Sequence, residues 1–362
     1  MDIFLEMSKR FFRNGLHFFN DPSVGLRCII AVHNRRPKGY GAALGGVRMA
    51  AYNNIEEATY DVLRLAQGMT FKNLLADLPV GGGKAVILYN EGFCGDKEKR
   101  QNILSAFARC VDGLKGDYIT APDAGTNVSD MLEIGRHTKY VVGLLDPSPY
   151  TARGVLAGIK VGAKHLWGND SLKGKKVLIQ GAGKTGSALA GLLHMEGSQL
   201  IISDINIEIM MKVCEEYKAI HCHPEDIFNM DADIFAPCAR GAIINNKTIH
   251  HVIKNFKMVC GAANNQLEFG KEHGRQLKNA GILYLPDFVV NCGGVITSHY
   301  ELINGYEKAE RDSDFISRKV EEQVTKQITT VLENSKAGNV LATNEVAEEM
   351  ALKILANEEK SD

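Results

Sequence analysis

The chain has 362 residues, 45% of them hydrophobic, which is enough for two globular domains that each bury a core. Its 42 Lys and Arg residues nearly balance 43 Asp and Glu residues, so the net charge of −1 gives no electrostatic basis for binding nucleic acid or an anionic membrane. The N-terminus lacks the pattern of a signal peptide, no stretch reaches the apolar length of a membrane span, and the eight cysteines form no C-x-x-C motif. We therefore expect a cytoplasmic protein with free thiols. The tripeptide 221–223, His-Cys-His, has no second ligand cluster at finger spacing, so we predict no metal.

The first 145 residues alternate apolar strands with helices. We expect strands at 28–32 and 84–89 and a helix over 55–74 between them. Asn54 and Glu57 have the spacing of a capping box at the start of this helix. An apolar stripe from Ile55 to Met69 follows helical spacing, and its continuation places Lys72 on the same inward face.

Two lysines are the most informative residues of this half. Lys72 is expected to point inward, and Lys84 follows three glycines at the edge of an apolar strand. A buried lysine is rare unless an anion meets it, so the pair predicts a site for a carboxylate or a phosphate. Two cations at one point also favour the neutral, basic form of one of them.

A phosphate-binding P-loop is the alternative for this glycine-lysine sequence. The required early glycine is replaced by Leu78, and Ala85 stands where Ser or Thr is needed. A second glycine-lysine pair at Lys184 fails in the same way, because Leu178 occupies the glycine position. Neither lysine belongs to a Walker A motif.

The turn-rich segment 146–150 marks a domain boundary, after which we expect Thr151 to cap a helix that ends at Trp167. A strand at 175–180, the loop Gly181-Ala182-Gly183-Lys184-Thr185-Gly186, a helix at 187–195 and a strand ending at Asp204 follow. This order gives the G-x-G-x-x-G pattern the context of a dinucleotide site. The helix N-terminus offers N–H groups to the phosphates. The carboxylate of Asp204 accepts ribose hydroxyls and repels a 2′-phosphate, which favours NAD over NADP.

Two further apolar strands end in small and polar residues at 233–238 and 258–265. Strand ends line the ligand crevice of a doubly wound sheet, so Asn264 and Asn265 are candidate contacts of the nicotinamide ribose; ordinary turn asparagines are the alternative. We expect a two-domain α/β fold. Residues 1–145 form an α/β substrate and oligomerisation domain, residues 146–335 a Rossmann-type doubly wound NAD domain, and a C-terminal helix at about 340–362 packs back on the first domain.

Several motifs resemble one known family when taken in order along nearly the whole chain. They are Leu44–Met49, Asp61–Leu65, Gly68–Lys72, Gly81–Ile87, Pro122–Thr126, Thr151–Val155, Ala236–Cys238, Gly261–Leu267 and Asn291–Ile296. Together they resemble the Glu/Leu/Phe/Val dehydrogenase superfamily, and within it the leucine dehydrogenase branch. The resemblance implies reversible, NAD-dependent oxidative deamination of an aliphatic L-amino acid (leucine, isoleucine or valine) to its 2-oxo acid and ammonia by a homo-oligomer. It also implies a cleft between the two domains.

The resemblance also implies roles for particular residues. Lys72 holds the substrate carboxylate, Lys84 is the catalytic lysine, and Asp123 is the acid that works with it; a turn aspartate is the alternative for Asp123. The remaining substrate-pocket residues are Leu44, Gly45, Gly46, Met69, Val295 and Ser298. The cofactor residues are Thr151, Gly181, Gly183, Gly186, Asp204, Cys238, Ala239, Asn264 and Asn265.

Two positions leave the accepted side chain open. Ser298 stands where leucine dehydrogenases have an aliphatic residue and glutamate dehydrogenases have serine, whereas Leu44 stands where the latter have a lysine. Phenylalanine or tryptophan is therefore an alternative substrate, and glutamate a weaker one. A non-enzymatic alternative is an NAD-binding regulatory protein that has lost activity; the presence of Lys72, Lys84 and Asp123 argues against it.

Overall fold

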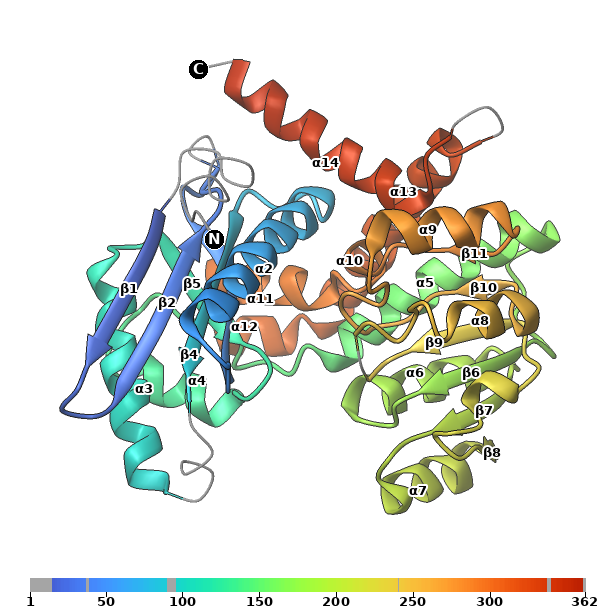
Figure 1. Cartoon of the computed structure of the whole chain (residues 1–362), viewed down its shortest axis with the longest axis horizontal. Helices are drawn as coiled ribbons and strands as arrows, with labels where there is room; N and C mark the ends of the chain where they lie inside the picture. The colour runs from blue at the N-terminus through green and yellow to red at the C-terminus, as the bar shows by residue number, and fades with distance from the viewer. Residues whose placement is uncertain (1–14, 37–38, 90–95, 240, 337–339, 361–362) are drawn as a thin grey trace. The chain divides into compact units, whose positions relative to one another are not determined.

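The computed structural model describes residues 15–36, 39–89, 96–239, 241–336 and 340–360 (Figure 1). These residues form two compact units. Unit 1 contains the described residues as far as Asp146, Val295–Ser313 and the chain end from Glu358; unit 2 contains Pro147–Gly294 and Asp314–Asn357.

Unit 1 is built on a five-stranded sheet with the order β1-β2-β4-β3-β5. Its strands are β1 (Gly15–Asp21), β2 (Leu26–Val32), β3 (Ala43–Ala50), β4 (Gly81–Leu88) and β5 (Tyr118–Pro122). β2 is antiparallel to β1 and β4, whereas β3 runs parallel to β4 and β5. In the parallel register, Val47 of β3 lies between Ala85 of β4 and Pro122 of β5.

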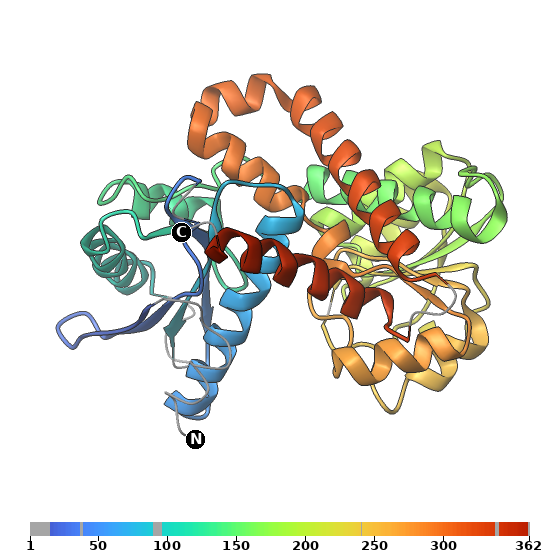
Figure 2. The ribbon, with the colours of Figure 1, turned by 90° about the horizontal axis from the view of Figure 1, so that it is seen from above.

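Helices cover both faces of this sheet. The helices are α2 (Ile55–Leu75), α3 (Lys97–Gly113) and α4 (Val128–Gly135). Cys28, Ile30 and Val32 of β2 pack towards α3 and α4, while Ile29 and Ala31 pack towards α2. Figure 2 shows α2 and α3 on opposite sides of the sheet. Because β2 is buried on both faces, its sequence is a continuous apolar run rather than an alternating one.

The predicted helix over 55–74 is confirmed as α2. The Asn54 side chain accepts the Glu57 N–H at 2.8 Å, but the Glu57 carboxylate accepts the N–H of Asn53 rather than that of Asn54. The stripe prediction was wrong at its start, because Ile55 is 45% exposed. The buried face of α2 consists of Ala58, Thr59, Val62, Leu63, Ala66, Thr70 and Asn73.

The strand predicted at 84–89 begins earlier, at Gly81, so the three glycines lie inside β4 rather than before it. A Cβ atom on Gly82 would lie 2.0 Å from the backbone nitrogen of Thr70 in α2. Gly82 thus lets α2 pack directly on the strand that carries Lys84.

Unit 2 contains a six-stranded parallel sheet with the order β11-β10-β9-β6-β7-β8. Its strands are β6 (Lys176–Gln180), β7 (Gln199–Ser203), β8 (Ile220–His221), β9 (Ile234–Pro237), β10 (Met258–Val259) and β11 (Leu283–Tyr284). This is the doubly wound Rossmann order, so the predicted α/β fold class is confirmed.

The helices of unit 2 begin with α5 (Ser148–Trp167) and α6 (Lys184–Met195). Those that follow are α7 (Ile207–Tyr217), η2 (Ile227–Asn229), α8 (Ile249–Asn255), α9 (Gly270–Asn279) and α10 (Asp287–Val290). The prediction that Thr151 caps α5 was wrong. Pro147 is the N-cap, and Thr151 lies in the first turn, where its hydroxyl donates to the Pro147 carbonyl at 3.0 Å.

Four helices complete the chain: α11 (Gly293–Asn304), α12 (Tyr306–Arg311), α13 (Ser313–Asn334) and α14 (Thr343–Lys360). The start of α14 is attached to α9 of unit 2 by an Arg275–Glu345 ion pair at 2.8 Å. At its end, Glu358 belongs to unit 1 and pairs with Arg36 at 2.5 Å. In the described part of the chain, no helix is both long and apolar enough to cross a membrane.

Candidate active site

Lys84 and Asp123 form the centre of the candidate site in unit 1. Lys84 lies in the middle of β4, opposite Ala31 of β2, and is only 5% exposed. Its Nζ lies 2.9 Å from Oδ2 of Asp123, which follows the last residue of β5. The Asp123 N–H donates to the hydroxyl of Thr126 at 2.9 Å, and that hydroxyl donates to the Val47 carbonyl of β3 at 2.8 Å. The predicted lysine–aspartate pair is thus brought together by three neighbouring strands, with Lys84 in β4, Val47 in β3 and Asp123 directly after β5.

The predicted pocket glycines explain how the pair can form. A Cβ atom on Gly46 would lie 2.8 Å from both Asp123 Cβ and the Pro122 carbonyl oxygen. On Gly45 it would lie 1.8 Å from the Gly83 carbonyl oxygen and 3.4 Å from Met69 Cγ. Only glycine allows β3 to pass this close to Asp123, so the Gly45–Gly46 backbone forms one wall beside the acid.

Arg48, two residues after Gly46, is a part of the site that the sequence did not single out. Its Nε donates to Asp123 Oδ2 at 3.2 Å, and its Nη1 donates to Asp61 Oδ2 at 2.9 Å. The Tyr52 hydroxyl donates to the same Asp61 oxygen at 2.9 Å. Arg48 lies within the Leu44–Met49 motif, but only the fold reveals a contact across 75 residues.

The charges around Asp123 set its ionisation. Burial alone would raise the pKa of Asp123, but the cationic groups of Lys84 and Arg48 outweigh burial and lower it to about 2. Asp123 is therefore a carboxylate at neutral pH, able to accept a proton or to hold a cationic ammonium group.

The other predicted substrate residues are placed by β3 and by two helices. Leu44 of β3 is 1% exposed, Met69 of α2 is half-buried, and Lys72 lies in the last turn of α2. Val295 and Ser298, each 9% exposed, are three residues apart on one face of α11. Convergence of Lys72, Val295 and Ser298 on Lys84 stays a prediction.

A second residue that the sequence did not reveal is Glu301, one helical turn after Ser298. It is 5% exposed and accepts three backbone N–H groups, from Gly143 and Leu144 at 3.1 Å and from Leu145 at 3.2 Å. All these residues belong to unit 1. Glu301 therefore fixes α11 to residues 143–145, which lie between α4 and α5 in the chain.

In unit 2, the glycine loop after β6 has the geometry of a phosphate cradle. Gly181 has a φ of +105°, a conformation that favours glycine. A Cβ atom on Gly186 would lie 1.8 Å from the Gly181 carbonyl oxygen, whereas one on Gly183 would meet nothing within 4 Å. The first and third glycines are needed for the turn and for packing. The second leaves open space before α6, which has no side-chain N-cap.

The predicted cofactor residues on neighbouring strands lie beside this loop. The Asp204 carboxylate follows β7 and accepts the N–H groups of Ala182 at 2.6 Å and Asn206 at 2.7 Å. Ala239, after β9, lies against Gly181, where an added Cβ would come within 2.7 Å of the alanine Cβ. Burial raises the pKa of Cys238 to about 11, so its thiol brings no negative charge towards a phosphate. These residues fit a dinucleotide.

Thr151, Asn264 and Asn265 lie on other segments of unit 2. A Cβ atom on Gly294, at the start of α11, would lie 3.7 Å from the Thr151 hydroxyl. The Asn264 side-chain oxygen accepts Nδ2 of Asn291 at 2.8 Å, and Asn265 has a left-handed φ of 53°. Both asparagines are exposed on a loop that is fixed from beneath by the buried side chain of Gln266. Their turn role and their proposed cofactor role are compatible.

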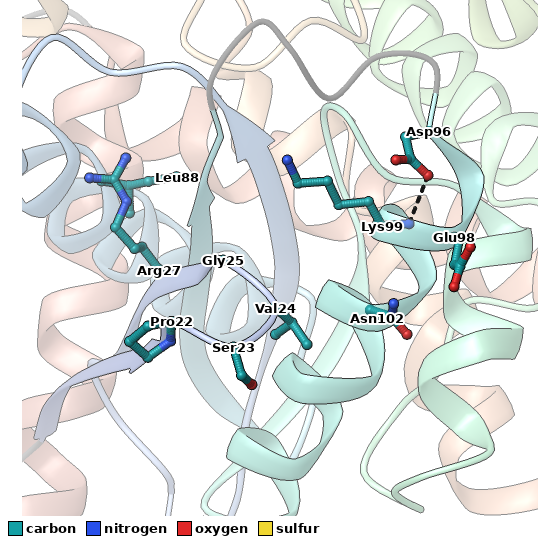
Figure 3. A pocket seen from close by; sticks show the side chains of 10 residues that line it. All are labelled: Pro22, Ser23, Val24, Gly25, Arg27, Leu88, Asp96, Glu98, Lys99 and Asn102. Atoms are coloured by element: carbon teal, nitrogen blue, oxygen red, sulfur yellow. Dashed lines mark hydrogen bonds between the residues drawn. The ribbon is translucent and has the colours of Figure 1, made fainter.

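Unit 1 also has a surface pocket of about 590 Å³ (Figure 3). It is lined by Pro22, Ser23, Val24, Gly25, Arg27, Leu88, Asp96, Glu98, Lys99 and Asn102. None of the predicted substrate or catalytic residues lines it.

Two family models match the chain. One is described as Glutamate/Leucine/Phenylalanine/Valine dehydrogenase and matches residues 143–361; the other, the dimerisation domain of Glu/Leu/Phe/Val dehydrogenases, matches residues 16–140. Leucine dehydrogenase of Bacillus subtilis is 43% identical, over 96% of this chain and 94% of that protein. Phenylalanine dehydrogenase of Caldalkalibacillus thermarum is 41% identical, over 79% of this chain and 78% of its own length.

The fold has close counterparts among solved structures. The crystal structure of L-tryptophan dehydrogenase from Nostoc punctiforme has a TM-score of 0.81 at 34% identity and covers 99% of both chains. Glutamate dehydrogenase from Plasmodium falciparum has a TM-score of 0.79 at 18% identity, covering 99% of this chain and 85% of its own. The latter likeness concerns the fold alone.

Proposed function

Since the chain belongs to the Glu/Leu/Phe/Val dehydrogenase family, we propose that it catalyses the reversible, NAD-dependent oxidative deamination of an aliphatic L-amino acid. The products are the 2-oxo acid, ammonia, NADH and a proton, with one water consumed. The observation that carries the proposal is the 2.9 Å contact between Lys84 Nζ and Asp123 Oδ2 in a buried, glycine-walled site.

The two side chains supply the proton transfers that this reaction needs. Removal of hydride from the substrate α-carbon leaves an iminium, which water must attack. A neutral Lys84 amine takes a proton from that water, and Lys72 holds the substrate carboxylate. Asp123 accepts the proton of the substrate ammonium and later returns one to the leaving ammonia. Its low pKa keeps it in the accepting form at neutral pH.

NAD supplies hydride acceptance when it is bound. Gly181, Gly183 and Gly186 would hold its pyrophosphate at the start of α6, and Asp204 would accept its ribose hydroxyls. Asp204 also disfavours a 2′-phosphate by like-charge repulsion. Thr151, Cys238, Ala239, Asn264 and Asn265 are proposed to line the remaining cofactor site.

Leu44, Met69 and Val295 favour an aliphatic substrate side chain. A γ-carboxylate among these apolar groups would be a buried charge without a cation, at a cost of several kcal/mol. Ser298 can donate one hydrogen bond but cannot neutralise a charge. An aromatic side chain is the second candidate, because Ser298 leaves more room than an aliphatic residue, and one structural neighbour is an L-tryptophan dehydrogenase.

The proposal extends to assembly and location. A match of residues 16–140 to a dimerisation domain supports a homo-oligomer. Seven free cysteines among the described residues are compatible with a reducing cytoplasm.

The decisive experiment is a comparison of kcat/KM for leucine, valine, phenylalanine, tryptophan and glutamate, each with NAD and with NADP. The proposal predicts that an aliphatic amino acid with NAD has the highest value, with modest discrimination among aliphatics of about 1–3 kcal/mol per methylene. An aromatic amino acid in first place would replace the substrate assignment. Glutamate in first place would refute the apolar pocket, and NADP equal to NAD would refute the role of Asp204.

A further inference from the structure

Charged side chains of alternating sign contact one another in a series that begins at Lys84. Asp123 Oδ2 contacts Lys84 at 2.9 Å and Arg48 at 3.2 Å, so both cations share one oxygen. Arg48 then contacts Asp61 at 2.9 Å, and Arg64 lies 3.9 Å from the other oxygen of Asp61. The side chains of Arg48, Asp61 and Asp123 are 25%, 17% and 19% exposed, whereas that of Arg64 is 45% exposed. The three inner groups are therefore less screened by water than Arg64.

We propose that Arg48 is a positioning residue for catalysis, which holds Asp123 in place and supplies a constant counter-charge to its carboxylate while Lys84 passes between its charged and neutral forms. The inference rests on the proposed function, in which Lys84 must be neutral to act as a base. Arg48 thereby becomes part of that mechanism, which explains why Arg48 and Lys84 contact the same oxygen of Asp123.

Asp123 needs a permanent cation beside it, because Lys84 alone cannot both act as a neutral base and supply the counter-charge of Asp123. When Lys84 loses its proton, Asp123 loses its counter-charge, and an unpaired buried carboxylate is costly. Without another cation beside Asp123, Lys84 would therefore tend to take its proton back. A guanidinium group cannot be deprotonated in proteins, so Arg48 remains charged through the cycle. It stabilises the Asp123 carboxylate in both states of Lys84.

Asp61 and Tyr52 hold Arg48 in place. Burial, and then the Asp61 carboxylate, raise the pKa of Tyr52, so its hydroxyl stays protonated and donates to Asp61 Oδ2 at 2.9 Å. The arginine fork is thereby fixed at Nη1 while Nε is aimed at Asp123. Asp61 therefore fixes the orientation of the Arg48 guanidinium.

The titratable and charged groups around the Lys84–Asp123 contact come from three strands, one helix and one loop. They are Arg48 of β3, Tyr52 of the following loop, Asp61 and Arg64 of α2, Lys84 of β4 and Tyr118 of β5. The Tyr118 hydroxyl donates to the Gly45 carbonyl at 2.7 Å, and burial raises its pKa, so it remains neutral through the working range.

The test compares Arg48→Met, which removes the charge, with Arg48→Lys, which keeps it. Arg48→Met should lower kcat by roughly 10- to 100-fold with little change in KM. It should also move the rising limb of the kcat/KM–pH profile to higher pH, because the Asp123 carboxylate then keeps only one of its two cationic partners and holds it more strongly. Arg48→Lys should return the limb towards its wild-type position. Arg35→Met is the matched control, since Arg35 forms a surface ion pair with Asp117 at 2.6 Å in the same unit; its profile should be that of the wild type.

A second readout needs no turnover. Carbon-13 NMR of labelled aspartate should show the Asp123 carboxyl titrating at higher pH in Arg48→Met than in the wild type. A wild-type profile and titration in Arg48→Met would overturn the inference. So would a fall in kcat that only follows a loss of folded protein while the pH profile and titration stay unchanged. If the wild type reduces no NAD with any amino acid but its Asp123 titration shifts as expected, the proposed function fails and the electrostatic role of Arg48 stands.

Discussion

Gly46→Ala tests whether the glycine wall positions the acid. The added Cβ would lie 2.8 Å from Asp123 Cβ, where an ordinary carbon–carbon contact is about 3.5 Å, so Asp123 must move by about 0.7 Å. Rotation of the Asp123 side chain cannot relieve the clash, because the backbone carbonyl oxygen of Pro122 is also 2.8 Å from the added Cβ. If the shift points away from Lys84, it lengthens the 2.9 Å Lys84–Asp123 contact to about 3.6 Å, beyond a hydrogen bond.

A misplacement approaching 1 Å costs about 10²-fold in rate, so kcat should fall by roughly 10- to 100-fold. Overpacking should cost about 1–3 kcal/mol of unfolding free energy. The assay is steady-state NAD reduction with leucine, together with urea unfolding. Gly113→Ala is the control, because Gly113 ends α3 and its added Cβ would meet nothing within 4 Å. Wild-type kcat in Gly46→Ala, or an equal loss in Gly113→Ala, would refute the reasoning.

Three further outcomes follow from the site. Lys72→Ala should raise KM for the amino acid strongly while NAD affinity is kept; a collapse of NAD affinity at constant KM would make Lys72 a cofactor residue. Glu301→Gln weakens three charge-assisted bonds to the 143–145 backbone, so it should cost about 1–3 kcal/mol of stability and raise KM more than it lowers kcat; an unchanged urea midpoint would contradict this. The pKa of Asp123 is lowered from 3.8 to about 2 in the folded protein. This shift contributes about 2 kcal/mol to the free energy of unfolding above pH 4, and the contribution is lost as the pH falls towards 2. The unfolding free-energy difference between wild type and Asp123→Asn should therefore shrink over that range; a pH-independent difference would show that the carboxylate charge is not its source.

The sequence predicted the parts of the site that depend on local pattern. The helix over 55–74, the strand–glycine loop–helix order around Gly181 and the acid at Asp204 all follow from spacing within about 25 residues. Lys84 and Asp123 were paired through a family resemblance, and their contact distance came only from the fold.

Residues that act across long separations were not predictable in this way. Arg48 meets Asp123 across 75 residues and Glu301 meets Gly143 across 158, and neither has a local pattern that marks its partner. The start of α5 was misplaced because Thr151 resembles an N-cap, whereas Pro147 and Ser148 already begin the helix there. The stripe on α2 was rotated because Ile55 lies at the exposed first turn, where packing rather than periodicity decides burial.

The proposed mechanism depends most directly on Lys84 being the base that activates water. The measurement is kcat of Lys84→Ala with a saturating aliphatic amino acid, with NAD binding followed by calorimetry on the same protein. Removal of a general base predicts a loss of turnover of roughly 10² to 10⁴. NAD affinity should be kept, because the cofactor residues belong to unit 2 and Lys84 to unit 1. Near-normal turnover in Lys84→Ala would contradict the mechanism.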